Sequence, residues 1–134
     1  MTTSELYKRG EMVRRRLRGD AGFERNQREY AAHPHMKTFI DTVTETVFGS
    51  LWARPGLDLK TRTLVCVVSD VATGRHPELE IHLEFALRQG WTETELVEVI
   101  LQLSGYVGVP LVREAMQVAV KVFDAAKAKG TGGP

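Results

Sequence analysis

The chain has 134 residues, of which 43% are apolar and 26% are charged, and its 18 basic and 17 acidic residues leave a net charge of +1. This length fits one domain with a sizeable core, and the composition is that of an average globular protein rather than a disordered chain. The balanced charge argues against general affinity for nucleic acid or for a membrane surface. The single cysteine, Cys66, excludes an internal disulfide and any Cys-x-x-Cys redox or zinc motif.

The N-terminal segment 1–20 lacks the apolar core of a signal peptide, and no apolar run reaches the roughly 18 residues of a membrane-spanning helix. We therefore expect a soluble, cytoplasmic protein. Within this segment, apolar residues are spaced loosely enough to predict a short amphipathic helix over 4–18, which Gly19-Asp20 breaks.

Apolar residues at steps of three and four predict a second amphipathic helix over 34–49, which ends at a glycine. After a turn over 52–56, Asp58 is the expected N-cap of a helix over 59–73. The β-branched run in this segment would also suit a buried strand, but about fifteen residues exceed the length of a typical strand. Because the helix is apolar most of the way round, we expect it in the centre of the fold or in a subunit interface.

The next helix carries a candidate proton-transfer pair. Pro77 suits the first position of a helix, and the segment ends at Gln89-Gly90. Glu78 and His82 are four residues apart and therefore lie on one face of this helix. A carboxylate beside an imidazole can fix its tautomer and favour the protonated ring. An ordinary surface pair has the same spacing, and spacing alone favours that alternative.

Further helices complete the chain. Thr92 and Glu95 have the spacing of a capping box at the start of a helix that reaches about Leu103. Glycines and a proline over 104–110 interrupt the pattern, and a final helix continues to about Ala128, followed by a loose, flexible tail over 129–134. The pattern predicts an all-α helical bundle that forms a single domain over residues 1–134.

A series of short motifs follows one another in a specific order. The motifs are Trp52-x-Arg54-Pro55-Gly56-Leu57, Lys60-Thr61-Arg62, Gly74-Arg75-x-x-Glu78-Leu79-x-x-His82, Gly90-x-Thr92-x-x-Glu95-Leu96-x-Glu98-Val99 and Tyr106-x-Gly108-Val109-Pro110. This series resembles the carboxymuconolactone decarboxylase family, whose fold is shared with the alkylhydroperoxidase AhpD group. The resemblance covers about residues 10–125 and implies an AhpD-like bundle of about six to seven helices that assembles as a homotrimer or homohexamer.

The motif around His82 separates two branches of this superfamily. The peroxidase branch has Cys-x-x-Cys-x-x-x-His with a glutamate upstream, whereas here Arg75 and Glu78 occupy the cysteine positions and Thr63 that of the glutamate. Thiol chemistry needs a nucleophilic and a resolving thiol, and Cys66 lies in an apolar run that disfavours a thiolate. A thiol peroxidase is therefore disfavoured, and the pattern resembles the decarboxylase branch.

The decarboxylase branch implies a small unsaturated lactone with two carboxylates as the substrate, in the degradation of aromatic compounds. The electron pair left by carbon dioxide runs into the lactone carbonyl, so no cofactor or metal is expected. The resemblance makes His82 the candidate proton donor, with Glu78 orienting it or acting as the acid. A dianionic substrate also calls for guanidinium groups. The candidate substrate-binding residues are Arg62, Arg75, Arg54, Arg15, Trp52 and Tyr106.

Purely structural roles are also possible for several of these residues. These are a solvent-exposed helix face for Arg14-Arg15-Arg16, core packing for Trp52 and packing at a helix junction for Tyr106. A non-catalytic helical oligomer that binds a small molecule is a third possible function.

The chain also departs from the decarboxylase pattern. The pattern prefers apolar residues at Ser69 and Asp70. Asp70 either faces His82, where it holds the imidazole protonated, or is a solvated or ion-paired carboxylate near a helix end. His76-Pro77 replaces an acidic pair, and Phe48 replaces a tryptophan, which suggests a shifted substrate.

Overall fold

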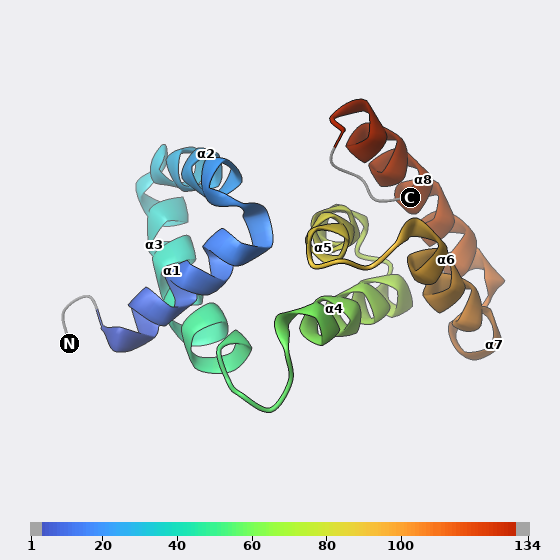
Figure 1. The fold of residues 1–134 in the computed structure, drawn as a ribbon, viewed down its shortest axis with the longest axis horizontal. Helices are drawn as coiled ribbons and strands as arrows, with labels where there is room; N and C mark the ends of the chain where they lie inside the picture. Colours follow the sequence, from blue (N-terminus) through green and yellow to red (C-terminus); the bar gives the residue numbers. More distant parts are fainter. Residues whose placement is uncertain (1–3, 131–134) are drawn as a thin grey trace. The chain divides into compact units, whose positions relative to one another are not determined.

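The computed structural model describes residues 4–130, and within this range it is helical with no β-strand (Figure 1). The predicted all-α bundle is confirmed. Of the predicted tail, residues 131–134 lie outside the described part. No helix within residues 4–130 combines the length and apolar character needed to cross a membrane. The elements are α1 (Glu5–Arg18), α2 (Asp20–Ala31), α3 (Pro34–Val43), the π-helix η1 (Thr44–Trp52), α4 (Leu59–Thr73), α5 (His76–Arg88), α6 (Glu93–Gln102), α7 (Ser104–Val107) and α8 (Val109–Ala128).

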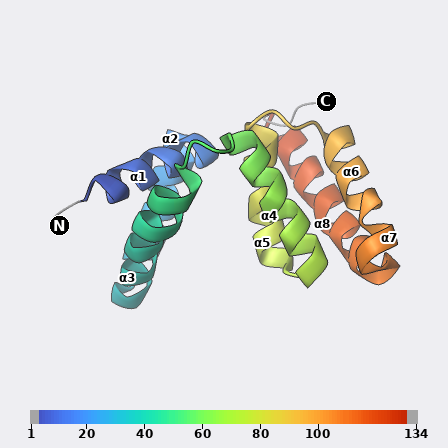
Figure 2. The ribbon, with the colours of Figure 1, turned by 90° about the horizontal axis from the view of Figure 1, so that it is seen from below.

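The contacts divide the chain into two compact units, an N-terminal unit of Met1–Leu57 and a C-terminal unit of Asp58–Pro134. In the N-terminal unit, α1 packs against η1 and α2, and α3 packs against α2 and η1. In the C-terminal unit, α4 packs against α5, and α8 packs against α4, α5 and α6 (Figure 2). That residues 1–134 form a single domain stays a prediction.

Two glycines let α1 and η1 approach closely in the N-terminal unit. A Cβ atom added to Gly10 would lie 1.9 Å from the carbonyl oxygen of Thr44, and one added to Gly49 would lie 1.9 Å from that of Leu6. The sequence pattern predicted that the helix beginning at Pro34 ends at Gly49, but the chain stays helical to Trp52 as a π-helix. Gly49 therefore serves the contact between two helices rather than a helix end.

The helix α2 was not predicted from the sequence. Only Phe23 is buried among its twelve residues, so few apolar residues in the sequence mark the face that packs against its neighbours. Its place depends on packing against α1 and α3, which shows how tertiary contacts override a weak local signal.

The predicted helix boundaries in the C-terminal unit are largely confirmed. The side chain of Asp58 accepts a hydrogen bond from the backbone N–H of Thr61 at 2.8 Å and caps α4. Thr92 and Glu95 form the expected capping box at the start of α6. The central helix α4 buries Val67 and Val71, although Val65 on its other side is 57% exposed. These buried residues join a core from α5, α6 and α8.

The close approach of α1 and η1 makes Gly10 sensitive to a single methyl group. Gly10→Ala is expected to lower the free energy of unfolding by about 2 kcal/mol, because the methyl would overlap a backbone carbonyl. Urea unfolding followed by circular dichroism measures this change. Gly22→Ala is the matched control, since its new Cβ meets its nearest atom at 3.4 Å. Alanine is also the better helix former, so this variant should be as stable as the parent or more stable. Equal losses in both variants would contradict the close contact.

Candidate functional site

The turn between α4 and α5 is built on the backbone of Asp70. Its carbonyl oxygen accepts the N–H of Gly74 and, at 3.0 Å, that of Arg75. Gly74 adopts the left-handed conformation with φ of 67°, which glycine reaches without a steric penalty. Pro77 follows at the start of α5. This short reversal places the last turns of α4 against α5, with which α4 is in contact.

The side chain of Asp70 contacts His82 across these two helices. Oδ2 of Asp70 lies 2.5 Å from Nδ1 of His82, and the two side chains are 7% and 19% exposed. An ionised carboxylate only accepts, so it forms a hydrogen bond here when Nδ1 carries a proton. The imidazole also makes an edge contact with the ring of Phe85, with ring centroids 5.7 Å apart. The ring is thus held on one side by a buried carboxylate, and its second nitrogen, Nε2, points away from Asp70.

Of the two alternatives for Asp70, the structure shows the one in which this residue faces His82. Glu78 is exposed in the first turn of α5, where the helix dipole favours a negative charge. The carboxylate that the structure places against the imidazole is therefore Asp70, and Glu78 lies one helical turn before His82. The sequence signal for this contact was a carboxylate within an apolar helix, which needs a partner when it is buried.

Cys66 lies one turn before Asp70 on α4 and is half-buried. Burial raises the pKa of its thiol to about 11, and the negative charges of Asp70 and Glu78 add to this effect. The neutral thiol is therefore the stable form around neutral pH. This electrostatic setting is the opposite of the electropositive surroundings that activate catalytic cysteines.

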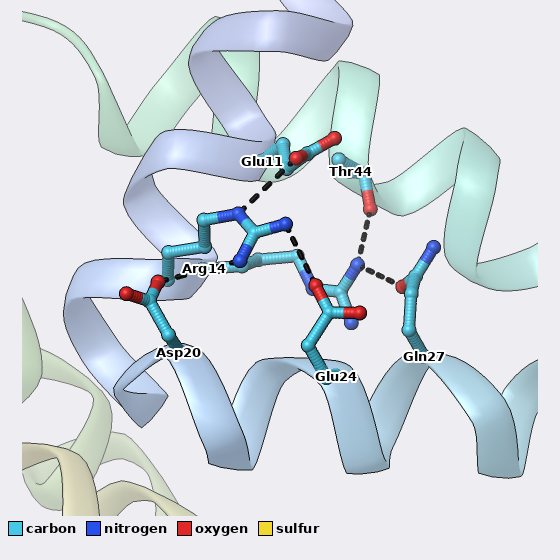
Figure 3. Close-up of polar contacts among 7 residues, drawn as sticks. Glu11, Arg14, Asp20, Glu24, Gln27 and Thr44 are labelled. Carbon is cyan, nitrogen blue, oxygen red and sulfur yellow. Dashed lines mark hydrogen bonds and ion pairs between the residues drawn. The ribbon is translucent and has the colours of Figure 1, made fainter.

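Arg14 is a buried cation in the N-terminal unit (Figure 3). It is 2% exposed, and burial lowers the pKa of its guanidinium below the ordinary value. Its guanidinium carbon lies 4.7 Å from the centroid of the Phe23 ring. Neutral oxygens from α2 and η1 accept its N–H groups, so Arg14 ties three helices together. These acceptors are Gln27 at 2.6 Å, Asn26 at 2.7 Å and Thr44 at 3.2 Å.

Arg15, a predicted substrate-binding residue, joins the same region through carboxylates. Its nitrogens lie 3.2 Å from Glu11, 3.3 Å from Asp20 and 2.8 Å from Glu24. Hydrogen bonds to these carboxylates, led by that to Glu24, raise the pKa of its guanidinium. Arg14 and Arg15 thus form a network between α1 and α2 rather than a plain solvated face. A role of Arg15 in binding substrate stays a prediction.

The other predicted binding residues fall in both units. In the N-terminal unit, Trp52 is buried, its ring centroid 5.8 Å from that of Phe48, and Arg54 is exposed in the turn that follows. In the C-terminal unit, Arg62 is half-buried near the start of α4 and Arg75 is exposed at the N-cap of α5. Tyr106 in α7 is 78% exposed. This exposure does not fit a role in packing at a helix junction.

A metal centre was not expected from the sequence. Across residues 4–130, no three or more histidine, cysteine or acidic side chains converge in a way that could hold a metal ion. The candidate site consists of the Asp70–His82 pair and Phe85, with Cys66 one turn before Asp70 and Glu78 one turn before His82.

Comparisons with known proteins decide the family. The sequence model described as the Carboxymuconolactone decarboxylase family matches residues 26–121. A 4-carboxymuconolactone decarboxylase of Acinetobacter baylyi is 34% identical over 123 residues, which cover 92% of this chain and 90% of the relative. The chain belongs to the carboxymuconolactone decarboxylase family. A nitrosuccinic acid decarboxylase of Metarhizium robertsii is 33% identical over 133 residues, covering 96% of this chain and 92% of the relative.

These relatives support the catalytic class as well as the family. Both are named decarboxylases and both match nearly the whole chain, so this member of the carboxymuconolactone decarboxylase family is an enzyme of the carboxy-lyase class. An uncharacterised 15.0 kDa protein of Paracoccus denitrificans is 35% identical over 81 residues, which cover 59% of this chain and 60% of that protein.

The raised pKa of Cys66 predicts that its thiol reacts slowly with disulfides. At pH 8 the native protein should react with a disulfide reagent such as DTNB on the order of a hundredfold more slowly than an exposed cysteine, because so little thiolate is present. The rate should rise as the pH approaches 11. The absorbance of the released thiolate follows the reaction, and the denatured chain is the control that reacts at the ordinary rate. Fast reaction of the folded protein at pH 8 would contradict the burial of this thiol.

The raised pKa of the Cys66 thiol also affects the stability of the fold. The folded thiol keeps its proton to a higher pH than the unfolded one, so the unfolded state loses its proton first as the pH rises. The contribution of Cys66 to the free energy of unfolding is therefore lost between about pH 9 and about pH 11.

Proposed function

We propose that the chain is a cofactor-independent decarboxylase of a small carboxylated lactone, similar to 4-carboxymuconolactone, or of a related diacid. The names of two relatives support this substrate class, since one is named for 4-carboxymuconolactone and the other for nitrosuccinic acid. An unsaturated lactone and a nitro group can each accept the electron pair that a departing carbon dioxide leaves behind. A substrate that carries its own electron acceptor needs no cofactor for this step.

The observation that carries the proposal is the contact of His82 with Asp70, which leaves Nε2 as the nitrogen directed elsewhere. In the proposed reaction the bond between the carboxylate and the ring carbon breaks, and its electron pair moves into the lactone carbonyl. His82 donates a hydrogen bond to the resulting dienolate or transfers the Nε2 proton to carbon. Water then returns a proton to the imidazole.

Glu78 has a secondary role in this proposal. It is exposed one turn before His82 on α5, close enough to the α4 side to act on the thiol of Cys66. From there it supplies an alternative acid or relays a proton to the imidazole. Orientation of His82, the other role predicted for Glu78, has a better candidate in Asp70, whose oxygen is in direct contact with the ring.

The substrate carboxylate that stays behind needs an anchor. We propose Arg62, Arg75 and Tyr106 of the C-terminal unit, which also carries His82, as substrate-binding residues. Substrate binding by Arg15, Trp52 and Arg54 of the N-terminal unit stays a prediction from the resemblance. Among the arginines, Arg75 has the position that best suits an anionic ligand, because it is exposed at the N-terminus of the helix that carries His82. Arg15 already lies against three carboxylates.

Decarboxylation is tested directly with the two compounds for which the relatives are named. With 4-carboxymuconolactone or nitrosuccinic acid and no added cofactor, the purified chain is expected to release carbon dioxide, measured by a coupled bicarbonate assay. His82→Gln should lower kcat roughly a hundredfold or more, because it removes the proton donor. His35→Gln is the matched control, since His35 is exposed on α3 and lies outside the site. Full activity of His82→Gln would remove this residue from the mechanism, and no turnover at high enzyme concentration would remove the proposed substrates.

The anchoring arginines are tested by a matched pair of variants. Arg75→Met should raise KM about tenfold or more with little change in stability, because it removes an exposed charge that pairs with the substrate. Arg88→Met is the matched control and should leave KM unchanged, because Arg88 is exposed in the last turn of the same helix, at the end away from Arg75. Steady-state kinetics measure KM, and urea unfolding checks that both variants remain folded. An unchanged KM in Arg75→Met would remove Arg75 from substrate binding.

Two expectations from the resemblance remain proposals: a role in the degradation of aromatic compounds, and self-association as a homotrimer or homohexamer. A cytoplasmic location, expected from the sequence, is also a proposal. A thiol peroxidase is disfavoured, because its chemistry needs a reactive thiolate and the pKa of Cys66 is raised.

A further inference from the structure

We infer that Asp70 is a positioning residue for His82: its carboxylate holds a proton on Nδ1 and thereby makes Nε2 the nitrogen that serves the substrate. The kinetic part of this inference rests on the proposed function, whereas the state of the imidazole can be measured without any substrate. Asp70 does not touch the reacting atoms in this scheme, and it acts through the ring that it orients.

The fold gives this contact a rigid base. Asp70 and His82 project from two helices that pack against each other, and Asp70 is almost completely buried. The backbone carbonyl of Asp70 also closes the turn by accepting the N–H groups of Gly74 and Arg75. One residue thus fixes both the start of the returning helix and the orientation of a ring on it. Phe85 limits the ring further through its edge contact. Such second contacts keep a catalytic group in one geometry.

The contact has a definite chemical consequence. A neutral imidazole has one proton, and the partner of one nitrogen decides which nitrogen carries it. With a carboxylate 2.5 Å from Nδ1, the proton stays on that side, and any second proton enters and leaves at Nε2. When the ring is doubly protonated, the carboxylate offsets its positive charge. Proton transfer from Nε2 to carbon then returns the ring to the neutral form with its proton on Nδ1.

Neighbouring groups do not compete for this task. The thiol of Cys66, one turn before Asp70, keeps its own proton around neutral pH because its pKa is about 11. Glu78 is exposed at the helix start rather than against the ring.

The first test measures the ring itself. In protein labelled with ¹⁵N at histidine, long-range ¹H–¹⁵N correlations identify which nitrogen holds the proton, and His82→Gln assigns the signals by their loss. The expected result is a His82 ring with its proton on Nδ1 when neutral, and a shift of that proton towards Nε2 in Asp70→Leu. Ser69→Ala, which alters the exposed neighbour of Asp70, should leave the signals unchanged. A neutral ring protonated on Nε2 in the parent protein overturns the inference, whether or not the Asp70 variant folds.

The second test uses a double-mutant cycle in decarboxylation. Asp70→Asn should lower kcat about tenfold or more with KM changed by less than about threefold, because it affects the proton donor rather than binding. In the His82→Gln background the same substitution should have no further effect, since Asp70 acts only through the ring. Independent, multiplying losses would overturn the inference, as would an Asp70→Asn variant with the parent kcat. If the chain releases no carbon dioxide, the proposed substrates fail, and the ring measurement still decides the role of Asp70.

Discussion

The arrangement of the C-terminal unit depends on a carboxylate buried in its central helix. Removing such a group from water costs several kcal/mol unless a charged or hydrogen-bonding partner is present. Asp70 meets this constraint with His82, and the short turn at Gly74 brings the two helices into the required register. A shift of either helix by one residue would separate the two groups and leave a polar atom unsatisfied in the interior. The pair therefore links the geometry of the fold to the geometry of the site.

The N-terminal unit solves a similar problem in another way. Arg14 is as buried as Asp70, but its hydrogen bonds go to the neutral oxygens of Asn26, Gln27 and Thr44 and its guanidinium lies over an aromatic ring. A guanidinium keeps its proton over the whole physiological range, so this network can bind and hold but cannot exchange a proton. An imidazole paired with a carboxylate can do both. Arg14 is thus suited to a structural role in the N-terminal unit, whereas the Asp70–His82 pair in the C-terminal unit is also suited to proton transfer.

The sequence was a good guide where local signals decide the outcome. Asp58, Pro77 and Thr92 mark the starts of helices because caps and proline act on the residues next to them. The helix at 20–31 and the π-helix depend on packing between elements, which no local pattern shows. The contact partner of His82 was harder still to predict from the sequence. A spacing of four residues pointed to Glu78 on the same helix, whereas the contact with Asp70 depends on how two helices face each other.

The family relationship has a physical consequence for substrate choice. When the electron acceptor belongs to the substrate, the protein contributes a proton donor, hydrogen bonds and charges that hold the remaining carboxylate. His82 sits within a packed helix, where a change of position would disturb the core. Arg54 and Arg75 lie in a turn and at a helix start, where substitutions disturb few contacts. With the proposed roles, substitutions at Arg54 or Arg75 can change how the remaining carboxylate is held while His82 keeps its place in the packed helix. The proposed contribution of Asp70 is separate, because it concerns the orientation of His82 rather than the choice of acid.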